Sequence, residues 1–283
     1  MAGHAAAATG TIVLTGASAG IGAAAAIELT RRGHEVLAVG RSTTKLGEVR
    51  WRMEAAAPLG VHVPEPVTAD FASLAEVRTL AEVVLDRCPR IDVLANNAGL
   101  ILPQREESAD GHEMIFAVNH LAPFLLTNLL VSRLQASGGR VVTTSSDAHK
   151  GGSIHMDDLQ LHSWGRWKAY CQSKLANILF TTELGRRTGL PASSFHPGLV
   201  RTEFGRGSFV ALASKLIRPL YRTPEQGAET LVWLATDPEG AAPTAAYYVS
   251  CRPGRPTAAA QDAEVARRLW EASAVLVSLP GAG

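Results

Sequence analysis

Tyr170 and Lys174 stand four residues apart in the segment 169–177, and both carry groups that handle protons. On a helix, residues at i and i+4 lie on one face, so the ammonium would stand over the same surface as the phenol. A free tyrosine has a pKa of about 10. A cation held nearby favours the phenolate and lowers that pKa. The pair therefore predicts a general acid or base that works near neutral pH.

A glycine-rich turn near the N-terminus predicts a dinucleotide site. Residues 11–15 are typical of a short buried strand, and they lead into Gly16, Gly20 and Gly22 and then an alanine-rich helix. Glycines let the backbone approach a pyrophosphate, and the helix N-terminus offers unpaired N–H groups and a positive dipole end. The spacing is G-x-x-x-G-x-G rather than the commoner G-x-G-x-x-G. A plain strand-to-helix turn is the alternative interpretation.

The motifs together resemble the short-chain dehydrogenase/reductase family, and they occur in family order over nearly the whole chain. They are Thr15-Gly16-x-x-x-Gly20-x-Gly22, Asn96-Asn97-Ala98-Gly99, Ser146, Tyr170-x-x-x-Lys174 and His196-Pro197-Gly198. The retinol dehydrogenase-like branch, which includes the oxidoreductase domain of WW-domain oxidoreductases, is similar in further segments. These are residues 118–130, 145–149, 173–180 and 266–271.

The resemblance implies hydride transfer between C4 of a nicotinamide and a carbonyl or carbinol carbon. Tyr170 would be the acid in reduction and the base in oxidation, and Lys174 would lower its pKa and bind the nicotinamide ribose. Ser146 would polarise the carbonyl, while Ser145 would face the other way because strand side chains alternate. Asn119 would hold a water that links the lysine to solvent. An asparagine bonded only to its own helix is the alternative.

The end of the second predicted strand favours NADP(H), with NAD(H) as the second choice. Gly40 stands where family members that prefer NAD usually have Asp, and Arg41 can clamp a 2′-phosphate. Ala19 departs from the pattern, because NADP-preferring relatives often have a basic residue there, and Ser18 would supply a hydroxyl instead. The alternative is that Arg41 only begins a solvated helix.

Other cofactor contacts follow from the resemblance alone. Asp70 would hydrogen-bond the adenine amino group, with a helix N-cap as the alternative role, and Asn97 lies in a motif that shapes the cleft and braces the sheet. The full set of expected contacts is Gly16, Ser18, Gly20, Ile21, Gly22, Arg41, Asp70, Asn97, Ala98, Gly99, Tyr170, Lys174, Pro197, Gly198, Val200 and Thr202.

Predicted strands and helices alternate along the chain, which indicates an α/β protein with a parallel sheet. The expected strands are 11–15, 35–39, 61–67, 93–96, 140–145, 192–195 and 246–250, and the expected helices are 20–32, 46–57, 74–87, 113–136, 167–188 and 224–236. No repeat or linker divides them. We therefore expect a single-domain Rossmann fold over residues 1–283, with a doubly wound sheet of about seven strands and helices on both faces.

Two insertions, near 147–169 and 203–222, interrupt the alternation after strands and are expected to wall the substrate pocket. Their apolar residues suggest a small lipophilic carbonyl or alcohol as substrate; they are Trp164, Trp167, Phe204, Phe209, Leu212 and Leu216. His149, His155 and His162 lie in the first insertion. Their irregular spacing speaks against a metal site and favours pocket lining or surface.

Composition excludes several partners. Acids and bases are interspersed and the net charge is +1, which argues against a nucleic-acid groove. Three cysteines without pairing or ligand spacing suit a reducing compartment and no metal. The alanine run at residues 5–8 is too short for a signal peptide or membrane anchor. We expect a cytoplasmic protein, although the retinoid enzymes it resembles often carry an anchor.

Two other functions and one question of assembly stay open at this level. A non-redox epimerase or dehydratase with a recycled cofactor is one alternative, and a cofactor-binding regulator without turnover is the other. The helices at 113–136 and 167–188 carry apolar residues on more than one face. In the family these two helices pair with their copies, so a homodimer or homotetramer is expected. The competing explanation is that residues 265–279 fold back over this surface.

Overall fold

The computed structural model describes residues 10–200, 222–242 and 246–279, and the strands among them form one sheet in the order β3-β2-β1-β4-β5-β6-β7-β8. Neighbouring strands from β3 to β7 run parallel, and β8 is antiparallel to β7. The bounds are β1 Thr11–Thr15, β2 Glu35–Gly40, β3 Val67–Thr68, β4 Val93–Asn96, β5 Arg140–Thr144, β6 Ala192–His196, β7 Ala246–Val249 and β8 Arg252–Pro253. The predicted doubly wound α/β fold is confirmed.

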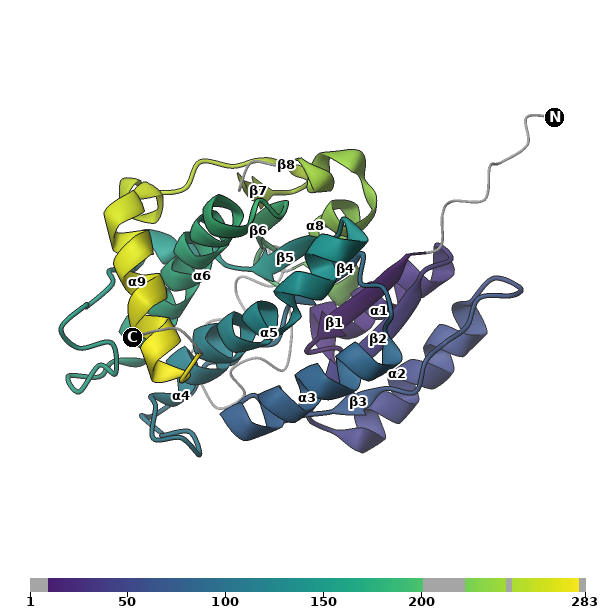
Figure 1. Ribbon diagram of the computed structural model, residues 1–283, viewed down its shortest axis with the longest axis horizontal. Helices are drawn as coiled ribbons and strands as arrows, with labels where there is room; N and C mark the ends of the chain where they lie inside the picture. Colours follow the sequence, from purple (N-terminus) through teal and green to yellow (C-terminus); the bar gives the residue numbers. More distant parts are fainter. Residues whose placement is uncertain (1–9, 201–221, 243–245, 280–283) are drawn as a thin grey trace.

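Helices cover both faces of the sheet (Figure 1). Ile12 and Leu14 pack with α1, α2 and α8, whereas Val13 between them packs with α3, α5 and α6 on the other face. Both faces are buried, so the strands are continuous apolar runs. The helices are α1 Gly20–Arg31, α2 Thr43–Ala56, α3 Leu74–Arg87, α4 Met114–Phe116, α5 Ala122–Ser137, α6 Arg166–Thr188, α8 Pro224–Thr236 and α9 Ala263–Leu276.

The prediction of a strand over 61–67 is wrong, because only Val67–Thr68 pairs with β2. Pro64 and Pro66 lack the N–H that a ladder requires. This segment therefore leads without ladder pairing into a short edge strand, although its composition favours β-structure.

The sequence analysis did not predict strand β8 or helix α9. The turn before β8 places Ser250 and Cys251 at φ values of 52° and 58°, which hairpin turns usually reserve for glycine and asparagine, so no turn signal was visible. Helix α9 begins after Asp262, whose side chain accepts hydrogen bonds from the backbone N–H groups of Glu264 and Val265. This cap is the local feature that could have revealed the helix.

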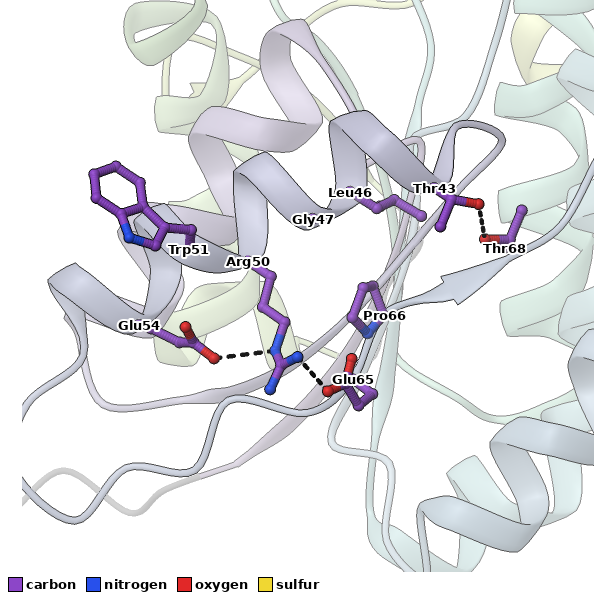
Figure 2. A pocket seen from close by; sticks show the side chains of 9 residues that line it. All are labelled: Thr43, Leu46, Gly47, Arg50, Trp51, Glu54, Glu65, Pro66 and Thr68. Atoms are coloured by element: carbon purple, nitrogen blue, oxygen red, sulfur yellow. Dashed lines mark hydrogen bonds and ion pairs between the residues drawn. The ribbon is translucent and has the colours of Figure 1, made fainter.

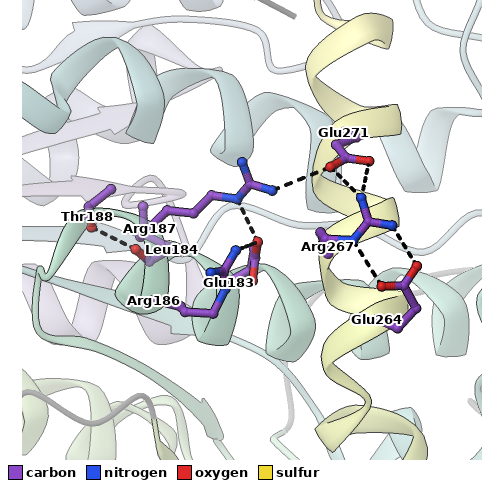
Figure 3. Close-up of polar contacts among 8 residues, drawn as sticks. All are labelled: Glu183, Leu184, Arg186, Arg187, Thr188, Glu264, Arg267 and Glu271. Carbon is purple, nitrogen blue, oxygen red and sulfur yellow. Dashed lines mark hydrogen bonds and ion pairs between the residues drawn. The ribbon is translucent and has the colours of Figure 1, made fainter.

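Helix α9 covers the outer surface of α5 and α6, which is the competing explanation given above for their apolar residues. The Trp270 ring lies 4.9 Å from that of Phe124 and 5.9 Å from that of Phe180. Figure 3 shows the polar side of this contact, where Arg187 bonds to the buried Glu183 at 2.6 Å and reaches Glu271 of α9 at 3.8 Å. The apolar length of Met114–Ser137 would suffice to cross a membrane, but most of it is buried inside this fold.

Most of the apolar residues from which a subunit interface was argued are buried within the single chain, although Leu129 is partly exposed. Leu125, Leu175 and Leu179 are each 1% exposed or less within the single chain. The homodimer or homotetramer itself stays a prediction, which now needs another surface than the one buried here.

We expect the wild-type protein to scatter light as a homodimer or homotetramer of its 29.9 kDa subunit at micromolar concentration, assembled through a surface that α9 does not cover. Trp270→Ala should uncover Phe124 and Phe180 and raise the mass further or lower the melting temperature. Val275→Ala, on the 63% exposed side of α9, is the matched control. A wild-type mass near 29.9 kDa would contradict the dimer or tetramer.

Candidate active site

Tyr170, Lys174 and Ser146 are brought together where β5 ends beside α6. The Lys174 Nζ lies 5.6 Å from the centre of the Tyr170 ring, as the i, i+4 spacing predicts. The Tyr170 side chain hydrogen-bonds that of Ser146. Lys174 is 3% exposed and donates to the carbonyl of Thr144, the last residue of β5, at 3.3 Å. Ser145 instead donates to the Lys174 carbonyl at 2.7 Å, which uses its hydroxyl to join strand and helix.

The ionisation of this group differs from the sequence-based expectation. Burial raises the pKa of Tyr170 to about 12, although the hydrogen bond from Ser146 opposes the rise. Burial also lowers the pKa of Lys174 to about 8. The expected lowering of the phenol pKa by Lys174 is therefore not seen, because desolvation raises this pKa and the ammonium donates to the Thr144 carbonyl. Tyr170 keeps its proton at neutral pH, which suits a general acid.

Asn119 faces the same site from a widened turn of helix. The predicted helix 113–136 contains a π turn at Ala117–Leu121. The Asn119 amide accepts from the Leu100 N–H at 2.7 Å and donates to the Leu100 carbonyl and the Ser173 hydroxyl, both at 3.0 Å. The alternative that Asn119 bonds only to its own helix is therefore wrong. π turns of this kind occur frequently at functional sites.

Pro123 supplies the physical reason for the π turn and the signal that the sequence analysis missed. A proline has no N–H, and its ring clashes with the carbonyl four residues earlier, which here belongs to Asn119. The helix therefore widens before Pro123, and the Ala122 N–H bonds five residues back to the Ala117 carbonyl. The widening turns Asn119 toward Leu100 and Ser173.

The glycine-rich turn has the shape that a pyrophosphate requires. Gly16 and Gly20 have φ values of 68° and 54°, which favour glycine. A Cβ at Gly22 would lie 2.1 Å from the Gly16 carbonyl oxygen, so the turn closes only without a side chain. Helix α1 begins after Ala19 with no side-chain cap and no acidic residue in its first turn. Its first N–H groups therefore suit an anionic ligand.

The motif Asn96-Asn97-Ala98-Gly99 holds this turn against β4. The Asn97 amide donates to the Thr15 carbonyl at 3.1 Å, and the Thr15 hydroxyl accepts from the backbone N–H groups of Asn97 and Ala98. A Cβ at Gly99 would lie 3.2 Å from the Asn119 amide oxygen and 3.5 Å from the Lys174 Nζ. The motif thus braces the cleft and leaves space beside the catalytic residues.

At the end of β2, the backbone of Gly40 lies against Ser18. A Cβ at Gly40 would lie 3.1 Å from the Ser18 hydroxyl oxygen, so a longer side chain would crowd the edge of the glycine turn. Arg41 is exposed and precedes the helix, since Ser42 is the N-cap of α2. Arg41 therefore lies just outside the helix, and its contact with a 2′-phosphate stays a prediction.

The groove between α2 and β3 does not provide another free cation (Figure 2). Arg50 bonds to Glu54 at 3.1 Å and pairs with Glu65 across the groove. The hydroxyls of Thr43 and Thr68 lie 3.2 Å apart at its upper end. Arg50 is thus already neutralised, and this groove lies on the far side of α2 from the glycine turn.

The structure describes the remaining predicted cofactor residues with one exception, Thr202. Asp70 accepts from the Ala72 N–H at 3.0 Å, and the N-cap of α3 is Ser73, so the N-cap role considered for Asp70 is wrong. Gly198 has a φ of 88°, and Val200 forms a parallel bridge with Arg222. Thr202 and residues 203–221 lie outside the described residues.

The first insertion supplies an apolar wall beside Tyr170. Trp164 packs in a small cluster with Ile101, Leu102 and Tyr170, and its indole N–H donates to the buried Glu113 at 3.1 Å. The sequence analysis missed the contribution of residues 100–102, although their apolar run directly after Gly99 was the available signal. Trp167 is 62% exposed, and its ring lies 5.8 Å from that of Tyr170.

The histidines of the insertion do not share one environment. His149 is fully buried behind the Ser146 turn, so its assignment to pocket lining or surface is wrong. His162 is exposed and bonds to Asp158 at 2.7 Å, and His155 is partly buried.

Comparisons with known proteins agree with this arrangement. The sequence profile of the short chain dehydrogenase family matches residues 10–210. A provisionally named daunorubicin C-13 ketoreductase of Streptomyces sp. (strain C5) is 44% identical over 270 residues, which cover 94% of this chain and 92% of that protein. Homo sapiens retinol dehydrogenase 14 is 39% identical over 296 residues, with 95% and 86% covered.

One solved structure adds a bound dinucleotide to the comparison. A provisionally named NAD(P)-dependent gluconate 5-dehydrogenase from Beutenbergia cavernae, with NADP at low occupancy, is 27% identical with a TM-score of 0.67. The match covers 86% of this chain and 96% of that one. These similarities include both the glycine-rich turn and the helix that carries Tyr170.

Proposed function

The chain belongs to the short-chain dehydrogenase family, in its retinol dehydrogenase-like branch, and is an oxidoreductase of carbonyl and alcohol groups; from this premise we propose that it uses NADP(H) on a small lipophilic substrate, with Tyr170 as general acid or base. The convergence of Tyr170, Ser146 and Lys174 is the observation that carries the proposal. The name of the ketoreductase relative supports reduction of a ketone as the first direction to test.

The residues of this chain divide the work of carbonyl reduction. Ser146 and Tyr170 donate hydrogen bonds to the carbonyl oxygen, and Tyr170 then transfers its proton as the alkoxide forms. Lys174 would bind the ribose hydroxyls and stabilise the phenolate that remains. Asn119 holds the Leu100 loop against Ser173 of α6 and would support a water that returns a proton. NADPH, when bound, supplies the hydride from C4 of its nicotinamide.

A panel of aromatic ketones, polycyclic ketones and long-chain aldehydes, followed by NADPH absorbance, tests the function. Net NADPH oxidation with formation of the alcohol is the expected result. Product formed without net oxidation of NADPH would favour the epimerase or dehydratase. NADPH binding without turnover of any substrate would favour the regulator, which the presence of both Tyr170 and Lys174 makes the weaker alternative.

We expect NADPH to bind more tightly than NADH. Arg41→Ala should reduce the ratio of the two dissociation constants by about ten- to a hundredfold. Gly40 leaves no carboxylate to repel a 2′-phosphate, and the exposed Arg41 follows the Gly40 backbone that lies against Ser18. Calorimetric titration of both cofactors into wild type and variant measures the effect. Arg268→Ala, which removes an exposed cation from α9 on the other face of the sheet, is the control. Equal affinities in the wild type would refute NADP preference.

We also propose a cytoplasmic location, because three cysteines without pairing spacing suit a reducing compartment. Fractionation of cells that express the tagged chain tests this proposal. Recovery in the membrane fraction after a salt wash would contradict it.

A further inference from the structure

His149 lies directly behind the catalytic serine, in the short 3-10 turn Asp147–Gly151 that follows Ser146. Its side chain is 0% exposed. Its Nδ1 lies 2.7 Å from the backbone carbonyl oxygen of Ser146, and the backbone N–H of Thr257 donates to its Nε2 at 3.4 Å. The imidazole therefore connects the catalytic turn to the segment between β8 and α9.

The two partners determine the proton positions on the ring. A carbonyl oxygen can only accept and a backbone N–H can only donate, so Nδ1 must carry the hydrogen and Nε2 must be bare. An imidazolium would place an N–H against the N–H of Thr257. Burial lowers the pKa of His149, which favours the required neutral form, while Asp147 opposes and Lys150 supports the lowering.

Other contacts hold the same turn from two neighbouring strands. The Asp147 N–H donates to His196 Nδ1 of β6 at 3.2 Å, and the Tyr247 hydroxyl of β7 donates to the Asp147 carboxylate at 3.0 Å. The Tyr247 ring also meets the His149 ring edge-on at 5.0 Å. The hydrogen bonds from His196 and Tyr247 end on Asp147, whereas the His149 imidazole contacts both the Tyr247 ring and the Ser146 carbonyl.

We propose that His149 is a positioning residue for Ser146, and that the segment between β8 and α9 holds the catalytic serine in register through it. Three hydrogen bonds hold the peptide that follows Ser146: its carbonyl accepts from the His149 imidazole and from the His149 backbone N–H, and its N–H, which belongs to Asp147, donates to His196. The imidazole bond is the one of the three that leads to the segment between β8 and α9. Rotation of that peptide would turn the Ser146 hydroxyl away from Tyr170. The effect on turnover rests on the proposed function, whereas the hydrogen-bonded tautomer does not.

Thr257→Pro removes the N–H donor with little other change, because Thr257 has a φ of −65°, the value that proline prefers. Thr257→Ala is the matched comparison, since it keeps the N–H and loses only a hydroxyl that has no hydrogen-bond partner. We expect kcat to fall about two- to tenfold in Thr257→Pro relative to Thr257→Ala, with KM for NADPH unchanged. Equal kcat values in the two variants would overturn the proposal.

Substitution of His149 separates the two ends of the link. The amide nitrogen of His149→Asn replaces Nδ1 and can donate to the Ser146 carbonyl, whereas His149→Leu keeps the volume and loses both bonds. We expect His149→Asn to retain more than half of the wild-type kcat and the kcat of His149→Leu to fall about tenfold. Equal losses in both variants would show that ring volume matters rather than the bond. If circular dichroism shows that His149→Leu does not fold, the comparison of Thr257→Pro with Thr257→Ala decides. If Thr257→Pro does not fold, the comparison of His149→Leu with His149→Asn decides.

The tautomer provides a readout that does not require turnover. In protein with ¹⁵N-labelled histidine, long-range proton–nitrogen correlation should show His149 with hydrogen on Nδ1, identified by its loss in His149→Asn. Thr257→Pro should relax this preference and Thr257→Ala should keep it. A wild-type signal with hydrogen on Nε2 would overturn the proposal even in an active enzyme. The expected tautomer without any carbonyl turnover would instead reject only the proposed function.

Discussion

Tyr170→Phe should reduce turnover by about 10²–10⁴-fold while the affinity for NADPH stays close to that of the wild type. The substitution removes only the transferable proton and keeps the ring, which packs with Trp164 and faces Trp167. Single-turnover absorbance and cofactor titration measure the two quantities separately. Tyr248→Phe is the matched control, since Tyr248 is 3% exposed and packs on Trp233 on the other face of the sheet.

The environment of Tyr170 also predicts the protonation state of its phenol in the neutral pH range. Because burial raises the phenol pKa to about 12, the acid needed for reduction is present throughout the neutral range. A Tyr170→Phe variant that kept most of the wild-type kcat would show that another group supplies the proton.

Lys174→Met should weaken NADPH binding by about ten- to a hundredfold and lower kcat as well, because the same ammonium binds the ribose and stabilises the phenolate. Burial lowers the lysine pKa to about 8. Reductive kcat/KM of the wild type should therefore decline above about pH 8, and this decline should disappear in the variant. Lys168→Met, an exposed position on the same helix, is the control.

Lys174→Met should also make the fold more stable at neutral pH. A lysine whose pKa is lowered from 10.5 to about 8 binds its proton more tightly in the unfolded chain. The free energy of unfolding of the wild type should therefore rise by about 3 kcal/mol between pH 8 and 10.5, and this rise should be missing in the variant. Denaturant titrations at pH 7 and 10.5 measure it. A less stable Lys174→Met protein at pH 7 would contradict the assigned desolvation.

Local chemistry made much of the fold and the site predictable from the sequence. The strand, glycine turn and helix at residues 11–31 follow from short-range patterns, and so does the common helical face of Tyr170 and Lys174. Pro123 was a local signal for the π turn at Asn119 that the sequence analysis did not use. The strand expected over 61–67 was wrong because apolar composition was given more weight than Pro64 and Pro66.

Only the tertiary structure decided properties that depend on residues far apart in the chain. Folding places Ser146 beside Tyr170, buries His149 between Ser146 and Thr257, and lays α9 over surface that resembled a subunit interface. The direction of the Tyr170 pKa shift also depends on residues far apart in the chain. The i, i+4 spacing determined that a cation lies near the phenol, whereas the desolvation that raises the phenol pKa depends on the packing of many segments.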